Sequence, residues 1–170
     1  MKINFRKKII GKKKIVGFTC GTFDLCHAGH VRMFQDCKNH CDYLIVGVQG
    51  DPSLDRPEKN KPVQSHEERL EIVKAIRFVD EVVSYNTEAD LYQLLKDFKE
   101  RRLIDIRFLG KDWQGKQFTG WDLGFKLYFN DRSHGFSSSE LRQRIYLAEK
   151  QKISDQEVIK QANNTFIKSS

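Results

Sequence analysis

The stretch Ile15-Val-Gly-Phe-Thr-Cys20-Gly-Thr-Phe-Asp-Leu-Cys-His27-Ala-Gly-His30 decides the fold of this 170-residue chain. Its first six residues are apolar or small, and they predict a buried strand over residues 15–20. Gly21 permits a tight exit from that strand, and a helix is expected from His30 to Asn39. In doubly wound sheets ligands bind beyond the carboxyl ends of the strands, so the residues after Cys20 are the expected site.

The rest of the chain alternates between strand-like and helix-like segments. Ser65 and Ser137 are each followed three residues later by Glu, the capping-box pattern of a helix start. Further strands are expected at 43–48, 81–84, 104–109 and 126–129, and further helices at 65–78, 89–100 and 137–149. This order predicts an α/β fold: a doubly wound, Rossmann-like, mostly parallel five-stranded sheet with helices on both faces.

Positive charge is concentrated at the N-terminus. The chain has 30 Lys and Arg residues against 23 Asp and Glu residues, a formal net charge of +7. Seven of the basic residues precede the first strand: Lys2, Arg6, Lys7, Lys8, Lys12, Lys13 and Lys14. Residues 15–170 are therefore neutral overall, which argues against a nucleic-acid-binding surface. We predict a basic arm (1–14), a folded α/β domain (15–150) and a polar tail (151–170), either frayed or a short packed helix.

Composition also excludes other classes of protein. No apolar run reaches the roughly 18 residues that a membrane span needs, and the basic N-terminus lacks the apolar core of a signal peptide. The four cysteines form no C-x-x-C pair and are expected to be reduced thiols of a cytoplasmic protein. A zinc site built from Cys26, His27, His30 and Cys41 is an alternative, although its spacing matches no common pattern.

The two histidines after the first strand suit an anionic ligand. His27 and His30 are three residues apart where a helix begins, so both rings can face one ligand. Gly29 between them leaves room for a phosphate near the backbone, and the free amides of a helix start attract anions.

The segment 132–139 contains a second pattern for anion binding. Ser137, Ser138 and Ser139 open a helix, so their hydroxyl and amide groups can form an anion nest. Arg132, just upstream, can add a charge-assisted contact to a phosphate. A plain helix cap explains Ser137 equally well when this segment is taken alone.

Residues 21–30 resemble the G-T-F-D-x-x-H-x-G-H signature of the cytidylyltransferases of the nucleotidyltransferase superfamily. The resemblance extends over about residues 15–145. Glu68-Arg69 and residues 76–83 (IRFVDEVV) resemble the family's E-R and I-R-Y-V-D-E-V motifs. Residues 110–116 (GKDWQGK) and 132–139 (RSHGFSSS) resemble the G-D-D-W-x-G-K and R-T-x-G-I-S-T-T motifs of glycerol-3-phosphate cytidylyltransferases. Motifs that recur in this order at compatible spacing are not expected by chance.

The resemblance implies transfer of CMP from CTP to a phosphorylated alcohol, with release of pyrophosphate. The predicted catalytic residues are His27, His30, Lys59, Lys61 and Arg132. The predicted nucleotide-binding residues are Thr22, Phe23, Asp24, Gly29, Arg77, Gly110, Asp112, Trp113, Ser137, Ser138 and Ser139. Either Lys59 or Lys61, in the Pro-rich loop 50–62, could be the family's triphosphate lysine. Mg²⁺ is expected to bridge the phosphates, with Asp24 supporting the cation or the histidines and without a dedicated protein metal site.

The acceptor is less firmly indicated than the nucleotide. Glycerol 3-phosphate is favoured, giving CDP-glycerol for a cell-surface polymer, but the chain departs from the glycerol-3-phosphate enzymes at three places. Lys111 replaces the first Asp of G-D-D-W, residues 85–90 lack the basic acceptor-binding residue, and residues 117–125, with Trp121, form a longer stretch. Another polyol phosphate or an aminoalcohol phosphate, an adenylyltransferase activity, and a nonenzymatic RNA-binding module remain the alternatives. The resemblance further implies a homodimer.

Overall fold

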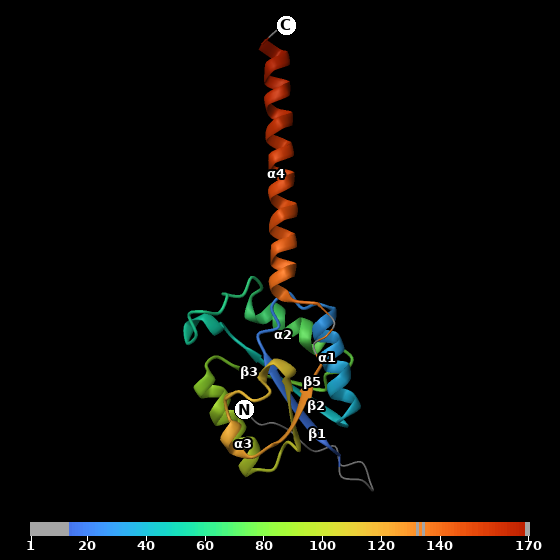
Figure 1. Ribbon diagram of the computed structural model, residues 1–170, viewed down its shortest axis with the longest axis vertical. Helices are drawn as coiled ribbons and strands as arrows, with labels where there is room; N and C mark the ends of the chain where they lie inside the picture. The colour runs from blue at the N-terminus through green and yellow to red at the C-terminus, as the bar shows by residue number, and fades with distance from the viewer. Residues whose placement is uncertain (1–13, 132, 134, 169–170) are drawn as a thin grey trace. The chain divides into compact units, whose positions relative to one another are not determined.

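Five parallel strands form one sheet in the computed structural model (Figure 1). The strands are β1 (Val16–Gly21), β2 (Tyr43–Gln49), β3 (Glu81–Tyr85), β4 (Ile106–Gly110) and β5 (Lys126–Asn130). Their order across the sheet is β3-β2-β1-β4-β5, and each neighbouring pair is parallel. The structure describes residues 14–131, 133 and 135–168, so the predicted basic arm lies almost wholly outside the described residues.

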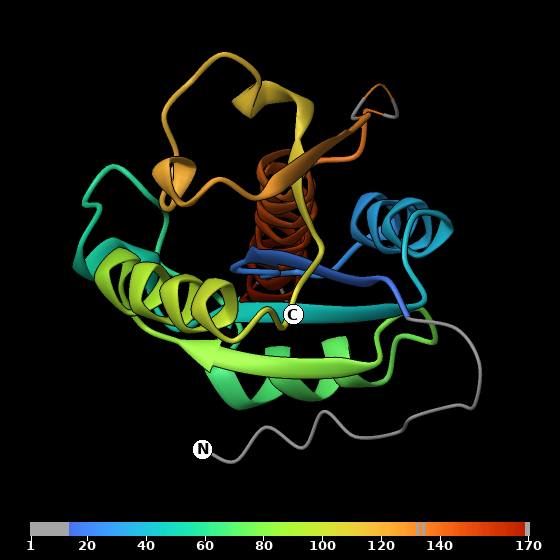
Figure 2. The same cartoon turned by 90° about the horizontal axis from the view of Figure 1, so that it is seen from below.

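Helices cover both faces of this sheet (Figure 2). The helices α1 (Ala28–Asn39) and α2 (His66–Lys74) place Phe34 and Val73 in a core with inward-facing residues of β2 and β4. On the other face, α3 (Glu88–Glu100) buries Leu95 and Phe98 against β1, β2 and β3. The predicted doubly wound α/β fold is confirmed.

The winding of the sheet reverses at β1. The chain passes from β1 through β2 to β3, and then returns so that β4 pairs with the opposite side of β1, with Gly17 beside Ile106 and Phe18 beside Arg107. Ligands of such sheets bind where this reversal occurs, beyond the carboxyl ends of the strands. Gly21 and Gly110 end the two strands at that point.

The helix predicted to reach Phe78 ends at Lys74, so that boundary is wrong. Ile76, Phe78 and Val79 all pack against the core that α1 and α2 share. A continued helix would place residues 76 and 78 about 200° apart around its axis, and both could not face one core. The chain therefore leaves the helix and turns into β3.

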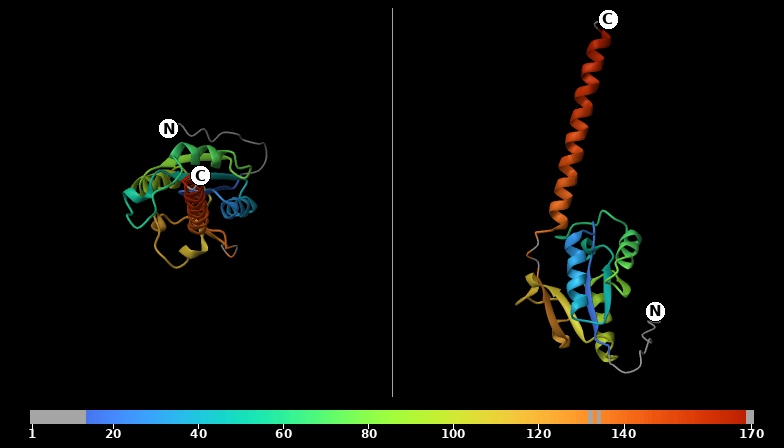
Figure 3. Two further views of the ribbon diagram at one scale, coloured as in Figure 1. Left: turned by 90° about the horizontal axis from the view of Figure 1, so that it is seen from above. Right: turned by 90° about the vertical axis from the view of Figure 1, so that its right-hand side faces the viewer.

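The chain divides into two compact units, residues 1–135 and residues 136–170. The second unit is built on one unbroken helix, α4 (Ser138–Lys168) (Figure 3). The expected helix end at Glu149 and the frayed or short-helix tail after it are wrong, because residues 138–168 contain neither Gly nor Pro to stop the helix. In the described part of the chain, no helix combines the length and the apolar character needed to cross a membrane.

Candidate active site

The loop between β1 and α1 fixes both predicted histidines through the backbone of the helix start. His27 is the N-cap of α1, and its Nδ1 accepts a hydrogen bond from the Gly29 amide at 3.1 Å. The Nδ1 atom of His30 accepts from the His27 amide at 3.3 Å, which closes a reciprocal capping box. The two rings stack with centroids 4.0 Å apart. Because both Nδ1 atoms are acceptors, the ring proton of each neutral imidazole belongs on Nε2.

The Phe23 side chain is buried and packs against the ring of His30. Its side chain is 5% exposed, and its ring meets His30 edge to face at 5.4 Å and Phe34 at 5.2 Å. Phe23 and Leu25 have φ values of 54° and 48°, which are unusual for bulky residues. Such conformations persist where surrounding contacts enforce them. The structure therefore assigns Phe23 a packing role under His30, while its predicted contact with nucleotide stays a prediction.

Asp24 ties the same loop to the segment that follows the predicted lysines. Its Oδ1 atom accepts hydrogen bonds from the amides of Val63 and Gln64, both at 3.0 Å. The side chain of Gln64 returns a bond, because its Oε1 accepts from the Leu25 amide at 2.7 Å. Asp24 is buried, and these hydrogen bonds support a role in joining the two loops.

Arg69 adds a buried clamp behind the two loops. Its Nη1 donates to the carbonyl oxygens of Thr22 at 2.7 Å and Gln49 at 2.5 Å, and its Nη2 donates to that of Gly50 at 2.6 Å. Arg69 lies in the first half of α2, where the Ser65–Glu68 capping box predicted from the sequence is present. The predicted supporting role of Arg69 takes the form of contacts with backbone carbonyls.

The predicted lysines lie between two anchored ends. After the short turn Pro52–Leu54, Arg56 donates to Oε1 of Gln49 at 2.6 Å, and the Glu88 amide donates to Oδ2 of Asp55 at 2.6 Å. Beyond Lys59 and Lys61, Asp24 holds the other end, as described above. Both lysines are exposed to solvent.

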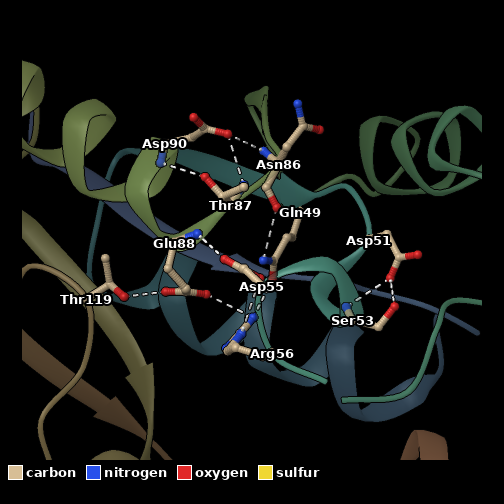
Figure 4. A network of polar contacts seen from close by, with 10 residues as sticks. All are labelled: Gln49, Asp51, Ser53, Asp55, Arg56, Asn86, Thr87, Glu88, Asp90 and Thr119. Atoms are coloured by element: carbon tan, nitrogen blue, oxygen red, sulfur yellow. Dashed lines mark hydrogen bonds and ion pairs between the residues drawn. The ribbon is translucent and has the colours of Figure 1, made fainter. Parts of the chain in front are cut away.

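A polar network lies at the carboxyl end of β2 and the start of α3 (Figure 4). The Glu88 carboxylate accepts from Nη2 of Arg56 at 2.9 Å and from the hydroxyl of Thr119. The carbonyl oxygen of Thr119 in turn accepts from Nη1 of Arg107, which is buried in β4. Residues about 30 positions apart in the chain thus meet beside the start of α3.

Sequence reasoning did not identify Arg56, Glu88, Arg107 or Thr119 as site candidates. A signal was present for Arg107, because a charged residue interrupts the apolar run predicted as a strand over 104–109. Charged residues are almost never fully buried unless they are paired or functional. No comparable signal marks Glu88 and Thr119, whose proximity depends on the order of the strands.

The remaining predicted residues fall into three groups. Gly110 ends β4, and Asp112 and Trp113 follow it in the turn Lys111–Trp113, at the same edge as the histidines. Arg77 lies before the amino end of β3, with its guanidinium 4.7 Å from the centroid of the Phe78 ring, so the structure does not bring it to that edge.

The third group belongs to the segment after β5. Ser137, Ser138 and Ser139 belong to the second unit, where Ser137 caps α4 by accepting from the Glu140 amide at 3.1 Å. Arg132 lies outside the described residues. The contribution of this segment to the site therefore stays a prediction.

The side chains that could bind a metal ion at this site are those of Cys, His, Asp and Glu. All four cysteines are free thiols, as predicted. Over the described residues, no group of three or more His, Cys, Asp and Glu side chains is placed to hold a metal ion. A divalent cation at this edge would therefore take its ligands chiefly from the phosphates of a bound nucleotide, which is the usual arrangement for Mg²⁺.

Comparison with known proteins agrees with this geometry. The cytidylyltransferase-like family model matches residues 18–144. Glycerol-3-phosphate cytidylyltransferase of Bacillus subtilis (strain 168) is 32% identical over 133 residues, which are 78% of this chain and 97% of that protein. The bifunctional protein HldE of Campylobacter jejuni is 34% identical over 156 residues, covering 85% of this chain and 32% of that protein. The chain thus spans about a third of the length of the HldE relatives it matches.

A solved structure shows the same fold. The lipopolysaccharide core biosynthesis protein from Thermoplasma volcanium superposes with a TM-score of 0.55 at 25% identity, covering 70% of this chain and 96% of that chain.

Proposed function

This chain belongs to the cytidylyltransferase-like family of nucleotidyltransferases, and we propose that it transfers the CMP group of CTP to a phosphorylated alcohol, with glycerol 3-phosphate favoured. The carrying observation is the His27–His30 pair at the start of α1. Two Nε2–H donors at the start of a helix, where the helix dipole is positive, form a site for a triphosphate. The name and nearly full-length match of the Bacillus subtilis relative support the cytidylyl group and the acceptor.

The proposed reaction is an in-line displacement at phosphorus. An oxygen of the acceptor phosphate forms a bond to the α-phosphorus of CTP. The bond from that phosphorus to the α,β-bridging oxygen breaks, and its electron pair leaves with pyrophosphate. Because the acceptor is already an anion, no protein nucleophile or general base is required. Catalysis then consists of positioning and charge stabilisation.

Each group of residues has a distinct part in this proposal. His27 and His30 donate to the triphosphate and stabilise the charge that develops in the transition state. One of Lys59 and Lys61 closes over the phosphates from the loop that Asp24 and Arg56 anchor. Mg²⁺, when bound with the nucleotide, supplies further charge neutralisation on the phosphate oxygens. Arg132 and Ser137–Ser139 are proposed to add anion contacts.

The experiment is a matrix of CTP and ATP against phosphorylated alcohols, scored by release of pyrophosphate. The proposal expects release with CTP and a phosphorylated alcohol together, and little release with either alone. Efficient use of ATP without CTP would replace it with an adenylyltransferase. No release from any combination, together with RNA binding that weakens steeply with salt, would indicate the binding module instead.

A further inference from the structure

Arg56 and Arg107 share an unusual feature: the Nε atom of each is buried and makes no hydrogen bond. Over the described residues, the buried side-chain nitrogen and oxygen atoms without a hydrogen-bond partner are Nε of Arg56 and Nε of Arg107. The nearest ion-pair contact of the Arg56 Nε atom is Oδ1 of Asp55 at 4.0 Å, beyond hydrogen-bond reach. Buried donors are almost always satisfied, so two orphans of one chemical kind require an explanation.

Arg107 is the more deeply buried of the two arginines. Its residue surface is 2% exposed, and no described Asp or Glu forms an ion pair with it. Its guanidinium lies 5.0 Å from the centroid of the Phe118 ring and donates to the Thr119 carbonyl oxygen. A guanidinium does not lose its proton in proteins, so burial leaves a cation whose remaining donors still require acceptors.

The two orphan donors belong to one cluster, which we call the arginine cluster and define as Gln49, Arg56, Glu88, Arg107 and Thr119. Glu88 bonds Arg56 with one carboxylate oxygen and Thr119 with the other, and Thr119 bonds Arg107 through its carbonyl. Gln49 ends β2 and Glu88 begins α3. Gln49 and Glu88 thus place one side of the arginine cluster at the carboxyl edge of the sheet, where the histidine loop also begins. Arg107 is the second residue of β4 and joins the cluster through its guanidinium.

The side chains of the arginine cluster are suited to binding the hydroxyl groups of a ligand. A hydroxyl oxygen can accept from a guanidinium N–H and at the same time donate to a carboxylate such as Glu88. An ammonium group has donors only and can satisfy neither orphan nitrogen. A ligand with two neighbouring hydroxyl groups can accept a hydrogen bond from Arg56 with one group and donate a hydrogen bond to Glu88 with the other.

Building on the proposed function, we propose that the arginine cluster binds the alcohol end of the acceptor and selects a polyol phosphate over an aminoalcohol phosphate. Thr119 and Phe118 come from the stretch 117–125, which precedes β5. Arg56 and Arg107 thereby supply the basic acceptor-binding groups that residues 85–90 lack.

The test compares three acceptors at saturating CTP: glycerol 3-phosphate, propyl phosphate, which lacks hydroxyls, and phosphoethanolamine. We expect the wild-type kcat/KM for glycerol 3-phosphate to exceed each of the others by at least about tenfold, the effect of one hydrogen bond of roughly 1.4 kcal/mol. R56M and R107M should each reduce this preference at least about fivefold. The Kd for CTP should be unchanged in R107M, since Arg107 does not anchor the lysine loop. R101M changes the exposed arginine that follows the last residue of α3 and pairs with Asp97, and it is the matched control.

Thermal unfolding separates recognition from a structural role. R107M removes a buried cation that has no carboxylate partner among the described residues, together with one hydrogen bond to the Thr119 carbonyl oxygen, so the melting temperature should change little. A lower melting temperature with the acceptor preference retained would overturn the proposal for Arg107, and R56M provides the second, partly exposed site.

Wild-type enzyme that uses phosphoethanolamine as well as glycerol 3-phosphate would overturn the proposal while leaving cytidylyl transfer intact. Failure of every acceptor to release pyrophosphate would overturn both.

Discussion

Arg69 donates a 2.7 Å hydrogen bond to the carbonyl oxygen of Thr22, which joins two sequence motifs 47 residues apart. The same guanidinium also holds the carbonyl oxygens of Gln49, Gly50 and Gln64. The start of the histidine loop is thereby fixed to the end of β2 and to the loop that carries the lysines. A single buried cation sets the spacing between the parts of the proposed triphosphate site.

Replacing Arg69 by Met should destabilise the protein. The substitution leaves several buried carbonyl oxygens without a donor, and bonds to charged groups contribute about 1.5–3 kcal/mol each. We expect the free energy of unfolding from urea titration to fall by about 3 kcal/mol. R101M should change it by less than about 0.5 kcal/mol, as is usual for an exposed position. A similar, small effect from both variants would contradict the proposed role of Arg69 in holding the two loops together.

The H30A variant should lose turnover without losing its fold. His30 is expected to donate to the transition state, and removal of such a donor typically lowers the rate by about 10²–10³. The measurement is kcat at saturating CTP, with circular dichroism as the check on folding. H40A is the matched control, because His40 follows α1 at its other end and packs on Tyr128. Turnover above a third of the wild-type value would show that the first motif has been misassigned.

The variants K59A and K61A should differ sharply in kcat. Both lysines are exposed between the two anchored ends of their loop, and we expect only one of them to reach the α-phosphate of a bound nucleotide. Its loss should lower kcat by at least about tenfold, while loss of the other should have little effect. The steady-state kinetics should be measured at 0.15 M salt, because salt at this concentration screens the long-range effect of either lysine charge. Equal and mild losses would mean that this loop does not close over the phosphates.

Stability should decrease on acidification through His66. Burial and the neighbouring Arg69 charge lower the pKa of His66, whose Nε2 lies 3.0 Å from the Ser84 hydroxyl oxygen. A folded-state pKa below the unfolded value of about 6.5 means that protonation favours unfolding. The contribution of His66 is thus complete above about pH 6.5 and lost as the pH falls toward the folded-state pKa. Between pH 7.5 and 5.5, wild-type melting temperature should fall more than that of H66N; parallel curves would refute this.

The buried thiols should resist alkylation. Burial raises the pKa of Cys41 to about 11 and raises that of Cys37 as well. Cys37 donates to Oδ1 of Asn130 at 3.6 Å, and Cys41 donates to the Cys37 carbonyl at 3.3 Å. Because the thiolate is the reactive form, iodoacetamide at pH 8 should label partly exposed Cys26 at least about tenfold faster, as read by peptide mass spectrometry. Urea should make all four cysteines reactive, and rapid native labelling of Cys37 would contradict the packing.

Local patterns in the sequence were sufficient for the strands and helix starts of the sheet domain. The apolar run before Gly21 forms the central strand, and the Ser65–Glu68 pair caps α2. These features depend on residues within a few positions of one another, where periodicity and capping chemistry act directly. The order of the motifs was likewise readable, and it identified the histidine loop.

Longer-range features required the tertiary structure. The end of α2 was misjudged because the packing of Ile76 and Phe78 on one core overrides their compatibility with a helix. Arg69 and Asp24 could be listed as site residues, but their partners are backbone groups about 20 to 50 residues away.

The sequence by itself therefore determined which residues are apolar, which segments are periodic and where anion-binding motifs occur. Only the tertiary structure decided which buried polar groups meet. The order β3-β2-β1-β4-β5 brings Arg56, Glu88 and Arg107 to one edge of the sheet. The physical reason is that a buried polar side chain takes its partner from neighbouring elements, and strand order and register choose those neighbours.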